Sequence, residues 1–177
     1  MQLWNASTGE ESWTLKGHSA GAVVRGLSFS PDGKQLADAS VDGSIKLWDV
    51  ESGGEIITLK VGGMLFDVTF SPDGKRLATC SSEANVSEWD VASGRKTLSL
   101  KALAARQTAQ FILNLQNPTT NYVYTVAYRP DGKQLTAASS DGLVRVWNLP
   151  PSVDQSDANL TKQSNCLNRR TGLTRYA

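Results

Sequence analysis

The chain has 177 residues, 40% of them hydrophobic, and its 18 basic and 17 acidic side chains leave a net charge of +1. This length and composition provide for one domain with a buried core. The balanced charge argues against nonspecific electrostatic binding to nucleic acid or anionic lipid. No apolar run approaches the roughly 20 residues of a membrane helix.

Strands are predicted from the first residues onward. Met1–Trp4 and Glu11–Leu15 match the third and fourth strands of the units that follow them. The first complete unit then contains β-branched and aromatic runs separated by turn residues, Pro31-Asp32-Gly33 and Asp42-Gly43 among them. These runs predict four short antiparallel strands, at Val23–Phe29, Gln35–Ser40, Ser44–Trp48 and Glu55–Leu59.

This unit recurs twice along the chain. Phe29–Ala37 returns as Phe70–Ala78 and again as Tyr128–Thr136, and the tryptophan that follows returns at Trp89 and Trp147. Both markers shift by the same amount each time, which shows that one block of residues is inserted before the third unit. Such a repeat, with no predicted helix, is typical of a solenoid or a propeller built from stacked units.

The repeated residues resemble those of the WD-repeat β-propeller family, on the strength of Gly17-His18, Ser30–Gly33, Asp42-Gly43 and Trp48-Asp49. The Ser-Pro-Asp-Gly-Lys units look like those of bacterial multi-repeat members. The resemblance implies an all-β fold, a partial β-propeller of about three and a quarter four-stranded antiparallel blades. Because closed propellers have typically four to eight blades, we expect the chain to be the C-terminal fragment of a longer propeller.

The expected organisation follows the repeats. Residues 1–148 form the propeller arc, and residues 149–177 form a linker with a weakly helical tail. Within the arc we expect a half-blade at 1–16, blades at 17–60, 61–100 and 122–148, and an insertion at 101–121. The first and last blades each lack a neighbour on one face, so self-association through these open faces is expected.

In WD-repeat proteins a hydrogen-bonded tetrad of His, Ser or Thr, Asp and Trp holds each blade. The resemblance implies tetrad-like roles for seven residues here: His18, Asp42, Trp48, Thr79, Trp89, Asp141 and Trp147. No unit matches in full. Asp38 stands at the hydroxyl position of the first unit, and Ala137 at that of the third. The second unit has Val61 at the His position. Each missing partner is expected to leave a buried polar group unpaired, at roughly 1–3 kcal/mol unless water fills in.

The second unit is predicted to be the weakest. Glu83-Ala84 stands where the other units have Asp-Gly, and alanine is strained at the positive φ that such a turn requires. Glu88 occupies the position of Leu47 and Val146, where strand alternation expects an apolar residue. Either this blade is degraded or Glu88 faces a polar partner, and degradation is the preferred interpretation.

The insertion at 101–121 is predicted to be the main partner-contact region. Its charged residues are basic, whereas the repeats carry a mildly acidic net charge. The insertion is predicted to be either an amphipathic helix or a turn followed by a strand. In the family, connections between blades share one face with the hairpin turns at 42–43, 83–84 and 141–142. Its apolar residues either contact a partner or cover a blade flank. With Trp13, which has no tryptophan counterpart in the other units, the candidate contacts are Trp13, Arg106, Phe111 and Leu113.

No catalytic pattern accompanies the repeats. The single histidine, His18, belongs to the Gly-His pair, and the sequence contains no zinc-binding cluster, phosphate-binding glycine loop or nucleophile elbow. We therefore expect no enzyme activity, metal or cofactor. The two cysteines, Cys80 and Cys166, form no disulfide framework, which favours a cytoplasmic location.

The preferred function is a non-catalytic protein–protein interaction scaffold or sensing module, as part of a larger propeller-containing signalling protein. Its expected partner is a protein or peptide, and neither nucleic acid nor a membrane is expected. Two alternatives stay open: a propeller-type enzyme with a site in the central channel, and a gene fragment without function of its own.

Overall fold

The computed structural model describes residues 1–102 and 122–150, and every regular element in these ranges is a β-strand. The first sheet contains β1 (Gln2–Trp4) and β2 (Glu11–Thr14). The second contains β3 (Val24–Phe29), β4 (Gln35–Ser40), β5 (Ser44–Asp49) and β6 (Glu55–Lys60). The third contains β7 (Leu65–Phe70), β8 (Arg76–Ser81), β9 (Asn85–Asp90) and β10 (Lys96–Lys101). The fourth contains β11 (Val123–Tyr128), β12 (Gln134–Ser139) and β13 (Val144–Asn148).

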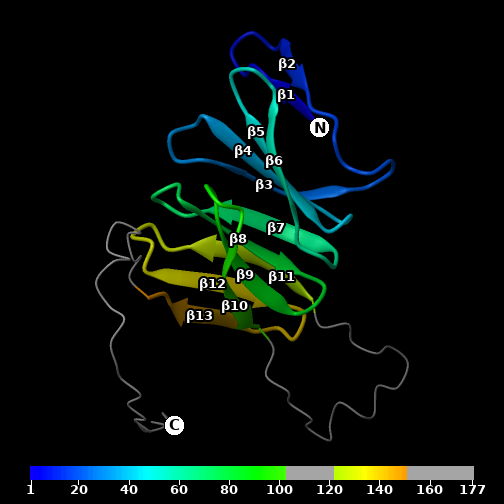
Figure 1. The fold of residues 1–177 in the computed structure, drawn as a ribbon. Helices are drawn as coiled ribbons and strands as arrows, with labels where there is room; N and C mark the ends of the chain where they lie inside the picture. The colour runs from blue at the N-terminus through cyan, green and yellow to red at the C-terminus, as the bar shows by residue number, and fades with distance from the viewer. Residues whose placement is uncertain (103–121, 151–177) are drawn as a thin grey trace, which may run out of the picture.

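The four antiparallel sheets follow one another as the blades of a partial propeller (Figure 1). We call them the half-blade (β1–β2), blade 1 (β3–β6), blade 2 (β7–β10) and blade 3 (β11–β13). Within each complete blade the strands pair in chain order, and the first strand of blade 2 packs between the first strands of blades 1 and 3. The predicted all-β class, the partial propeller and its strand positions are confirmed, with strand ends that differ by a residue. The predictions for 103–121 and 151–177 lie outside the described residues.

The blades are joined by apolar packing between facing sheets. Ala37, Ile45 and Leu47 of blade 1 lie against Phe70 and Trp89 of blade 2 in one buried cluster. A second cluster joins blade 2 to blade 3, with Ala78, Cys80 and Val86 against Val123, Val126 and Leu135. The half-blade is attached more lightly, through Leu15 against Leu36 and Trp48. Since side chains alternate between the two faces of a strand, neighbouring residues of blade 2 serve different junctions.

The turns between the first and second strands of blades 1 and 2 are fixed by their own serines. In blade 1 the Ser30 hydroxyl donates to Asp32 Oδ1 at 2.6 Å and accepts from the Gln35 backbone N–H at 2.9 Å. Ser71 makes the same two bonds in blade 2, and in blade 3 Arg129 stands at this position. Ala84 adopts φ 60°, whereas Gly43 and Gly142 hold the same turn position in the other blades. The expected strain at Ala84 is therefore present.

Glu88 is not a sign of a degraded blade, because it is buried in a polar cluster between blades 2 and 3. Arg76 Nη1 lies 3.2 Å from Glu88 Oε1, and the Tyr128 hydroxyl donates to Glu88 Oε2 at 2.9 Å. Thr97 Oγ1 also donates to Glu88, at 3.2 Å. Burial, and then the charge of Glu88, raise the pKa of Tyr128, so its hydroxyl keeps the proton that it donates. The preferred interpretation was wrong, since Glu88 faces a set of polar partners.

The same positions are apolar or neutral at the junction of blades 1 and 2. By strand register, Glu88 corresponds to Leu47, Arg76 to Gln35 and Tyr128 to Phe70. Leu47 and Phe70 are buried together in the first cluster. One fold therefore contains two versions of a blade junction, which differ at these three positions and at exposed Thr97, whose counterpart in blade 1 is Ile56.

We expect Glu88→Ala to lower the free energy of unfolding by about 3 kcal/mol, the lower end for a broken buried pair, because it takes the nearest acid from the half-buried Arg76. The triple variant Glu88→Leu, Arg76→Gln, Tyr128→Phe copies the other junction and should match or exceed the wild-type stability, since a packed apolar set avoids the desolvation of an ion pair. Urea unfolding followed by circular dichroism measures both. A triple variant no more stable than Glu88→Ala would contradict this account.

Two sheet faces of the described structure lack a complete neighbouring blade, since one is uncovered and the other is covered only in part by the half-blade. On the outer side of blade 3, Val144 is 70% and Val146 is 57% exposed, whereas Val86, at the position of Val144 in blade 2, is only 1% exposed. On the opposite side of blade 1, Leu27 and Phe29 are each more than half exposed, although their counterparts Val68 and Phe70 are buried. Apolar faces of this kind are typical interaction or aggregation sites.

We expect the purified chain to self-associate through these faces, as judged by sedimentation velocity at rising concentration. Val144→Lys with Val146→Lys should reduce the association without altering the melting temperature by more than a few degrees, because both side chains are exposed. Ile56→Lys, on the exposed outer strand of blade 1, is the matched control and should leave association unchanged. Equal association of the double variant and the wild type would exclude the face of blade 3 as the contact.

Candidate functional site

The tetrad residues of blade 1 are assembled around Asp38. His18 places Nε2 2.8 Å from Asp38 Oδ1 and Nδ1 3.0 Å from Asp42 Oδ2. The Trp48 indole N–H donates to Asp38 Oδ2 at 3.0 Å. The Asp38 carboxylate therefore does what a hydroxyl was expected to do, and it links histidine to tryptophan directly. The expectation that blade 1 lacks a complete tetrad is corrected. The family pattern has Ser or Thr at this position, but the Asp38 carboxylate supplies the acceptors that the tetrad requires.

The other blades keep only parts of this network. In blade 2 the Trp89 indole N–H donates to Thr79 Oγ1 at 3.2 Å. In blade 3 Asp141 binds Arg145 instead, with Nη2 2.6 Å from Oδ2, and Ala137 offers no acceptor to Trp147. The predicted unpaired groups do not occur at tetrad positions. Among the described residues, the only buried side-chain nitrogen or oxygen without a partner is Arg76 Nε.

Asp42 carries the charge that ties His18 to the hairpin turn. Burial by itself would raise the pKa of Asp42, but hydrogen bonds from the Ser44 hydroxyl, the Ser19 N–H and His18 together hold it well below its usual range. The ionised carboxylate is therefore favoured by the folded state. A carboxyl group with a depressed pKa stabilises the fold above about pH 4 and loses that contribution as the pH falls.

We expect the free energy of unfolding to fall between about pH 5 and pH 2, and Asp42→Asn to flatten this dependence. At pH 7 the variant should be roughly 1–3 kcal/mol less stable, because its amide cannot replace a charged acceptor. Chemical denaturation at a series of pH values measures both effects. Glu51→Gln, at an exposed turn position, is the control and should keep the wild-type pH dependence. A variant that keeps the full acid sensitivity would exclude Asp42 as its source.

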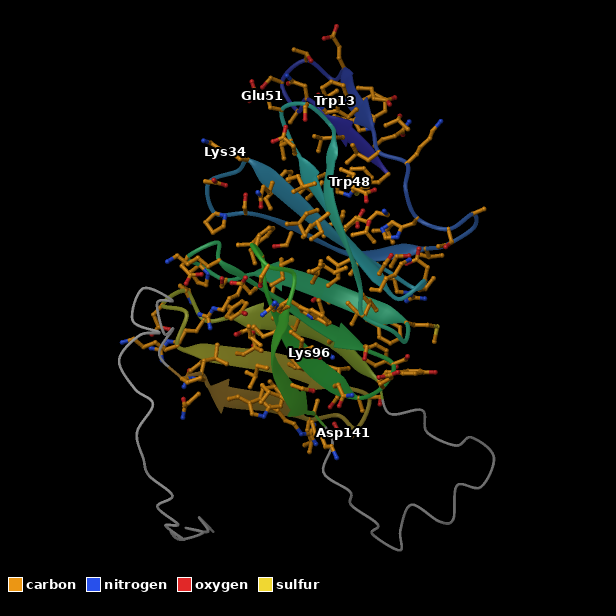
Figure 2. All side chains as sticks on the ribbon, in the orientation of Figure 1. Trp13, Lys34, Trp48, Glu51, Lys96 and Asp141 are labelled. Atoms are coloured by element: carbon orange, nitrogen blue, oxygen red, sulfur yellow. The ribbon has the colours of Figure 1, made fainter. Side chains whose placement is uncertain are left out.

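The predicted contact residues have mixed placements. Trp13 is 38% exposed and packs on the turn of blade 1 that carries Glu51 (Figure 2). Its ring lies so close to Gly53 that a side-chain carbon at that position would come within 2.5 Å of it. It thus braces the half-blade against blade 1, and its role toward a partner stays a prediction. The other three candidates, Arg106, Phe111 and Leu113, lie outside the described residues.

A surface that was not predicted from the sequence is formed by a β-bulge that recurs in the first strand of blades 1, 2 and 3. The pairing register shifts between Val24 and Gly26 in β3, between Leu65 and Asp67 in β7, and between Val123 and Thr125 in β11. The extra residues at these bulges occupy equivalent positions, and a bulge re-aims the side chain that it carries. They are Arg25, Phe66 and Tyr124.

The bulge reverses which residues are buried. Strict alternation from Phe70 and Val68 would bury Phe66 and expose Leu65. Instead Leu65 is fully buried and Phe66 is half-buried, and in blade 3 Val123 is buried whereas Tyr124 is exposed. The bulge therefore leaves Phe66 only half-buried, at the edge of the second core cluster, and exposes Tyr124 in the neighbouring blade.

These side chains are in contact across blades 1, 2 and 3. The Phe66 ring centroid lies 5.2 Å from that of Tyr122 and 5.8 Å from that of Tyr124, and the two tyrosine rings are 6.1 Å apart. The Arg25 guanidinium lies over Phe66, 5.4 Å from its centroid. The residues two positions earlier in each blade lie beside them, and Val23 and Met64 are exposed. We call the whole set the bulge surface: Val23, Arg25, Met64, Phe66, Tyr122 and Tyr124.

The bulge surface lies at the end of the blades that carries the hairpin turns. The carbonyls of Val23, Met64 and Tyr122 accept hydrogen bonds from Val41, Ser82 and Ser140, next to these turns. The Ala102 N–H donates to the Ala84 carbonyl at 3.0 Å, so both described residues that flank 103–121 are at this end. The signal that could have found the site is the recurrence of Arg25, Phe66 and Tyr124 at one offset before the Pro-Asp-Gly turn.

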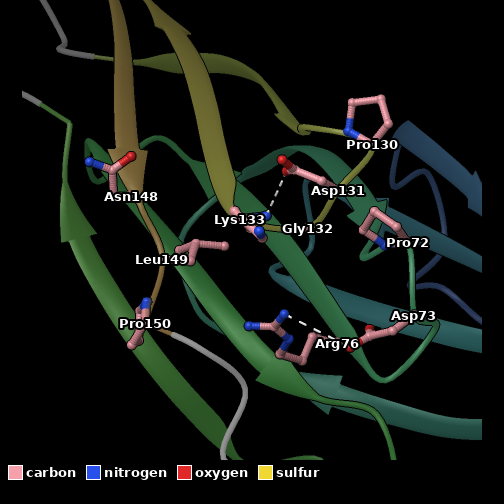
Figure 3. Close-up of a pocket in the computed structure, with 10 residues that line it drawn as sticks. All are labelled: Pro72, Asp73, Arg76, Pro130, Asp131, Gly132, Lys133, Asn148, Leu149 and Pro150. Carbon is pink, nitrogen blue, oxygen red and sulfur yellow. Dashed lines mark hydrogen bonds and ion pairs between the residues drawn. The ribbon is translucent and has the colours of Figure 1, made fainter.

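A cavity of about 610 Å³ opens at the opposite end of the first strands, between the Pro-Asp-Gly turns of blades 2 and 3 (Figure 3). Pro72, Pro130 and Leu149 form its apolar wall. Arg76 at its floor is engaged by Glu88, with Asp73 at 3.9 Å. In the described parts of the chain, no group of three or more His, Cys, Asp or Glu side chains could hold a metal ion, and no helix could cross a membrane.

Comparison with known proteins gives a family match over three segments. The family model described as "WD domain, G-beta repeat" matches residues 9–49, 56–90 and 109–148. The nuclear distribution protein PAC1 of Arthroderma otae is 28% identical over 84% of this chain, and the small ribosomal subunit protein RACK1y of Oryza sativa is 28% identical over 84%. The Notchless protein homolog of Arabidopsis thaliana is 43% identical over 28% of the chain.

The chain spans only part of these relatives: 33% of the PAC1 protein, 41% of RACK1y and 10% of the Notchless homolog. All three come from eukaryotes, so they give no support to the expected bacterial type.

Proposed function

This chain belongs to the WD-repeat family, and on that basis we propose that it is a non-catalytic interaction scaffold that binds a protein or peptide through the bulge surface. The observation that carries the proposal is the cluster of Phe66, Tyr122 and Tyr124, whose rings are held together at the end of blades 2 and 3. Aromatic side chains and arginine are the residues that most often dominate the binding energy of protein interfaces.

The first strands hold these side chains in place before any partner arrives. Asp67, next to Phe66, accepts hydrogen bonds from Thr125 Oγ1 at 2.8 Å and from the Val126 N–H at 3.1 Å, which ties β7 to β11 directly below the rings. Gly26 allows the backbones of β3 and β7 to approach, because a side-chain carbon there would lie 2.6 Å from Asp67 Cα. A contact surface that is already ordered loses little conformational entropy on binding.

The surface is also suited to recognition by its composition. Tyr124 is 52% exposed, and Met64 and Val23 provide exposed apolar contact area beside it. Tyrosine combines a large apolar ring with a hydroxyl that hydrogen-bonds, at a low cost in side-chain entropy. We propose that the chain serves in this way as part of a larger propeller-containing signalling protein in the cytoplasm. The buried free thiol of Cys80 suits a reducing compartment.

To test the proposal, a displayed library of random twelve-residue peptides is selected on the full chain, and the affinities of the recovered peptides are measured by fluorescence anisotropy. Tyr124→Ala should weaken binding about tenfold or more, since truncation of an aromatic that dominates an interface costs about 2 kcal/mol or more. Trp4→Ala is the matched control, because Trp4 is also about half exposed but lies in the half-blade. Thermal unfolding verifies that both variants are folded.

Two results would contradict the proposal. One is that repeated selections recover no peptide that binds the chain in solution. The other is that the recovered peptides bind Tyr124→Ala as tightly as the wild type, which would place their site elsewhere on the molecule.

A further inference from the structure

We infer that the segment bound at the bulge surface is acidic, with an aspartate or glutamate that pairs with Arg25 beside apolar side chains that cover Phe66 and Tyr124. The inference rests on the proposed function and adds the chemical class of the partner. It starts from the electrostatics of the surface, where a positive charge lies beside an apolar cluster.

Arg25 is exposed and has no carboxylate partner among the described residues. Three other arginines of the structure each have one: Arg76 pairs with Glu88 at 3.2 Å, Arg129 with Asp131 at 3.4 Å and Arg145 with Asp141 at 2.6 Å. The side-chain contact of Arg25 is instead the Phe66 ring. Its charge is therefore available to a bound molecule.

Among the described residues no carboxylate at this end of the blades forms an ion pair with Arg25, and three of them have other partners. Asp42 accepts hydrogen bonds from His18 and Ser44, and Asp67 accepts from Thr125 and Val126. Asp141 is paired with Arg145. These carboxylates hold blades and turns together, so using one of them to neutralise Arg25 would remove a structural bond.

The position of Arg25 over Phe66 prepares it for a carboxylate. A cation–π contact uses the charge of the guanidinium and not its N–H donors, so the donors stay free to form two parallel bonds with one carboxylate. Contact with the ring also restricts a long side chain, which reduces the entropy lost when the pair forms. A carboxylate bound here would gain a charge-assisted interaction at the edge of an apolar contact.

The order of the strands sets the order of contacts in the partner. Because β7 packs between β3 and β11, Arg25 lies at one end of the row, Phe66 in its centre and Tyr124 at the other end. The acidic residue of the partner therefore lies at one end of the bound segment and its apolar residues follow. Glu83 is an exposed acid in the hairpin turn beside Gly63 at this end of blade 2, so its charge disfavours an acidic ligand.

The experiment uses the peptides selected on the full chain. The recovered peptides should be enriched in Asp or Glu next to apolar residues. Arg25→Glu should weaken their binding at least tenfold, Arg25→Lys should weaken it less, and Glu83→Gln should strengthen it. Exchange of the peptide acid for its amide should lower affinity for the wild type but not for Arg25→Ala. Raising the salt concentration should weaken binding to the wild type more than to Arg25→Ala.

The outcomes separate the inference from the proposed function. If Tyr124→Ala abolishes binding while Arg25→Glu binds the same peptides as tightly as the wild type, the bulge surface is a contact site and the acidic partner is wrong. If the recovered peptides lack acids altogether, the inference is also overturned. If no peptide depends on Tyr124, the proposed function is contradicted and the inference with it.

Discussion

The structure depends on the burial of each sheet face by the sheet of a neighbouring blade. In blade 2 this condition is met on both sides: Leu77 and Ala78 are consecutive, point to opposite faces and are both fully buried. A four-stranded sheet of this size has no helix to cover it in the described structure, so the neighbouring blade provides its core. The turns, the bulges and the bulge surface keep their positions because the first strands of adjacent blades are packed together.

Local chemistry made the strands predictable, because each is bounded by turn residues whose backbone preferences are specific. Pro31, Asp32 and Gly33, or Asp42 and Gly43, fix where a strand ends without reference to the rest of the fold. Contacts between distant residues were not predictable in this way. The partners of Glu88 include Tyr128 in the next blade, and the role of Asp38 depends on geometry that a family pattern expects from a hydroxyl. The bulges escaped prediction because alternation alone assigns Phe66 to the core.

A bulge serves recognition here without a long loop. The residues on either side of each bulge remain in the ladder, so the extra residue is presented by a strand that is hydrogen-bonded on both sides of it. Arg25, Phe66 and Tyr124 differ greatly in chemistry although they hold the same position in their blades. The fold therefore tolerates variation at this position, and a repeat protein can change what it binds there while its packing residues stay constant.

The two blade junctions respond differently to temperature. The junction of blades 1 and 2 is held by apolar burial, which weakens on cooling. The junction of blades 2 and 3 adds the pair of half-buried Arg76 and buried Glu88, and the cost of removing such charges from water falls as temperature rises. Cooling therefore weakens the apolar packing of both junctions, whereas warming lowers the desolvation cost of an ion pair only at the second. One junction of the arc thus gains a compensating contribution on heating and the other does not, so the contact of blades 1 and 2 is expected to open first as the temperature rises.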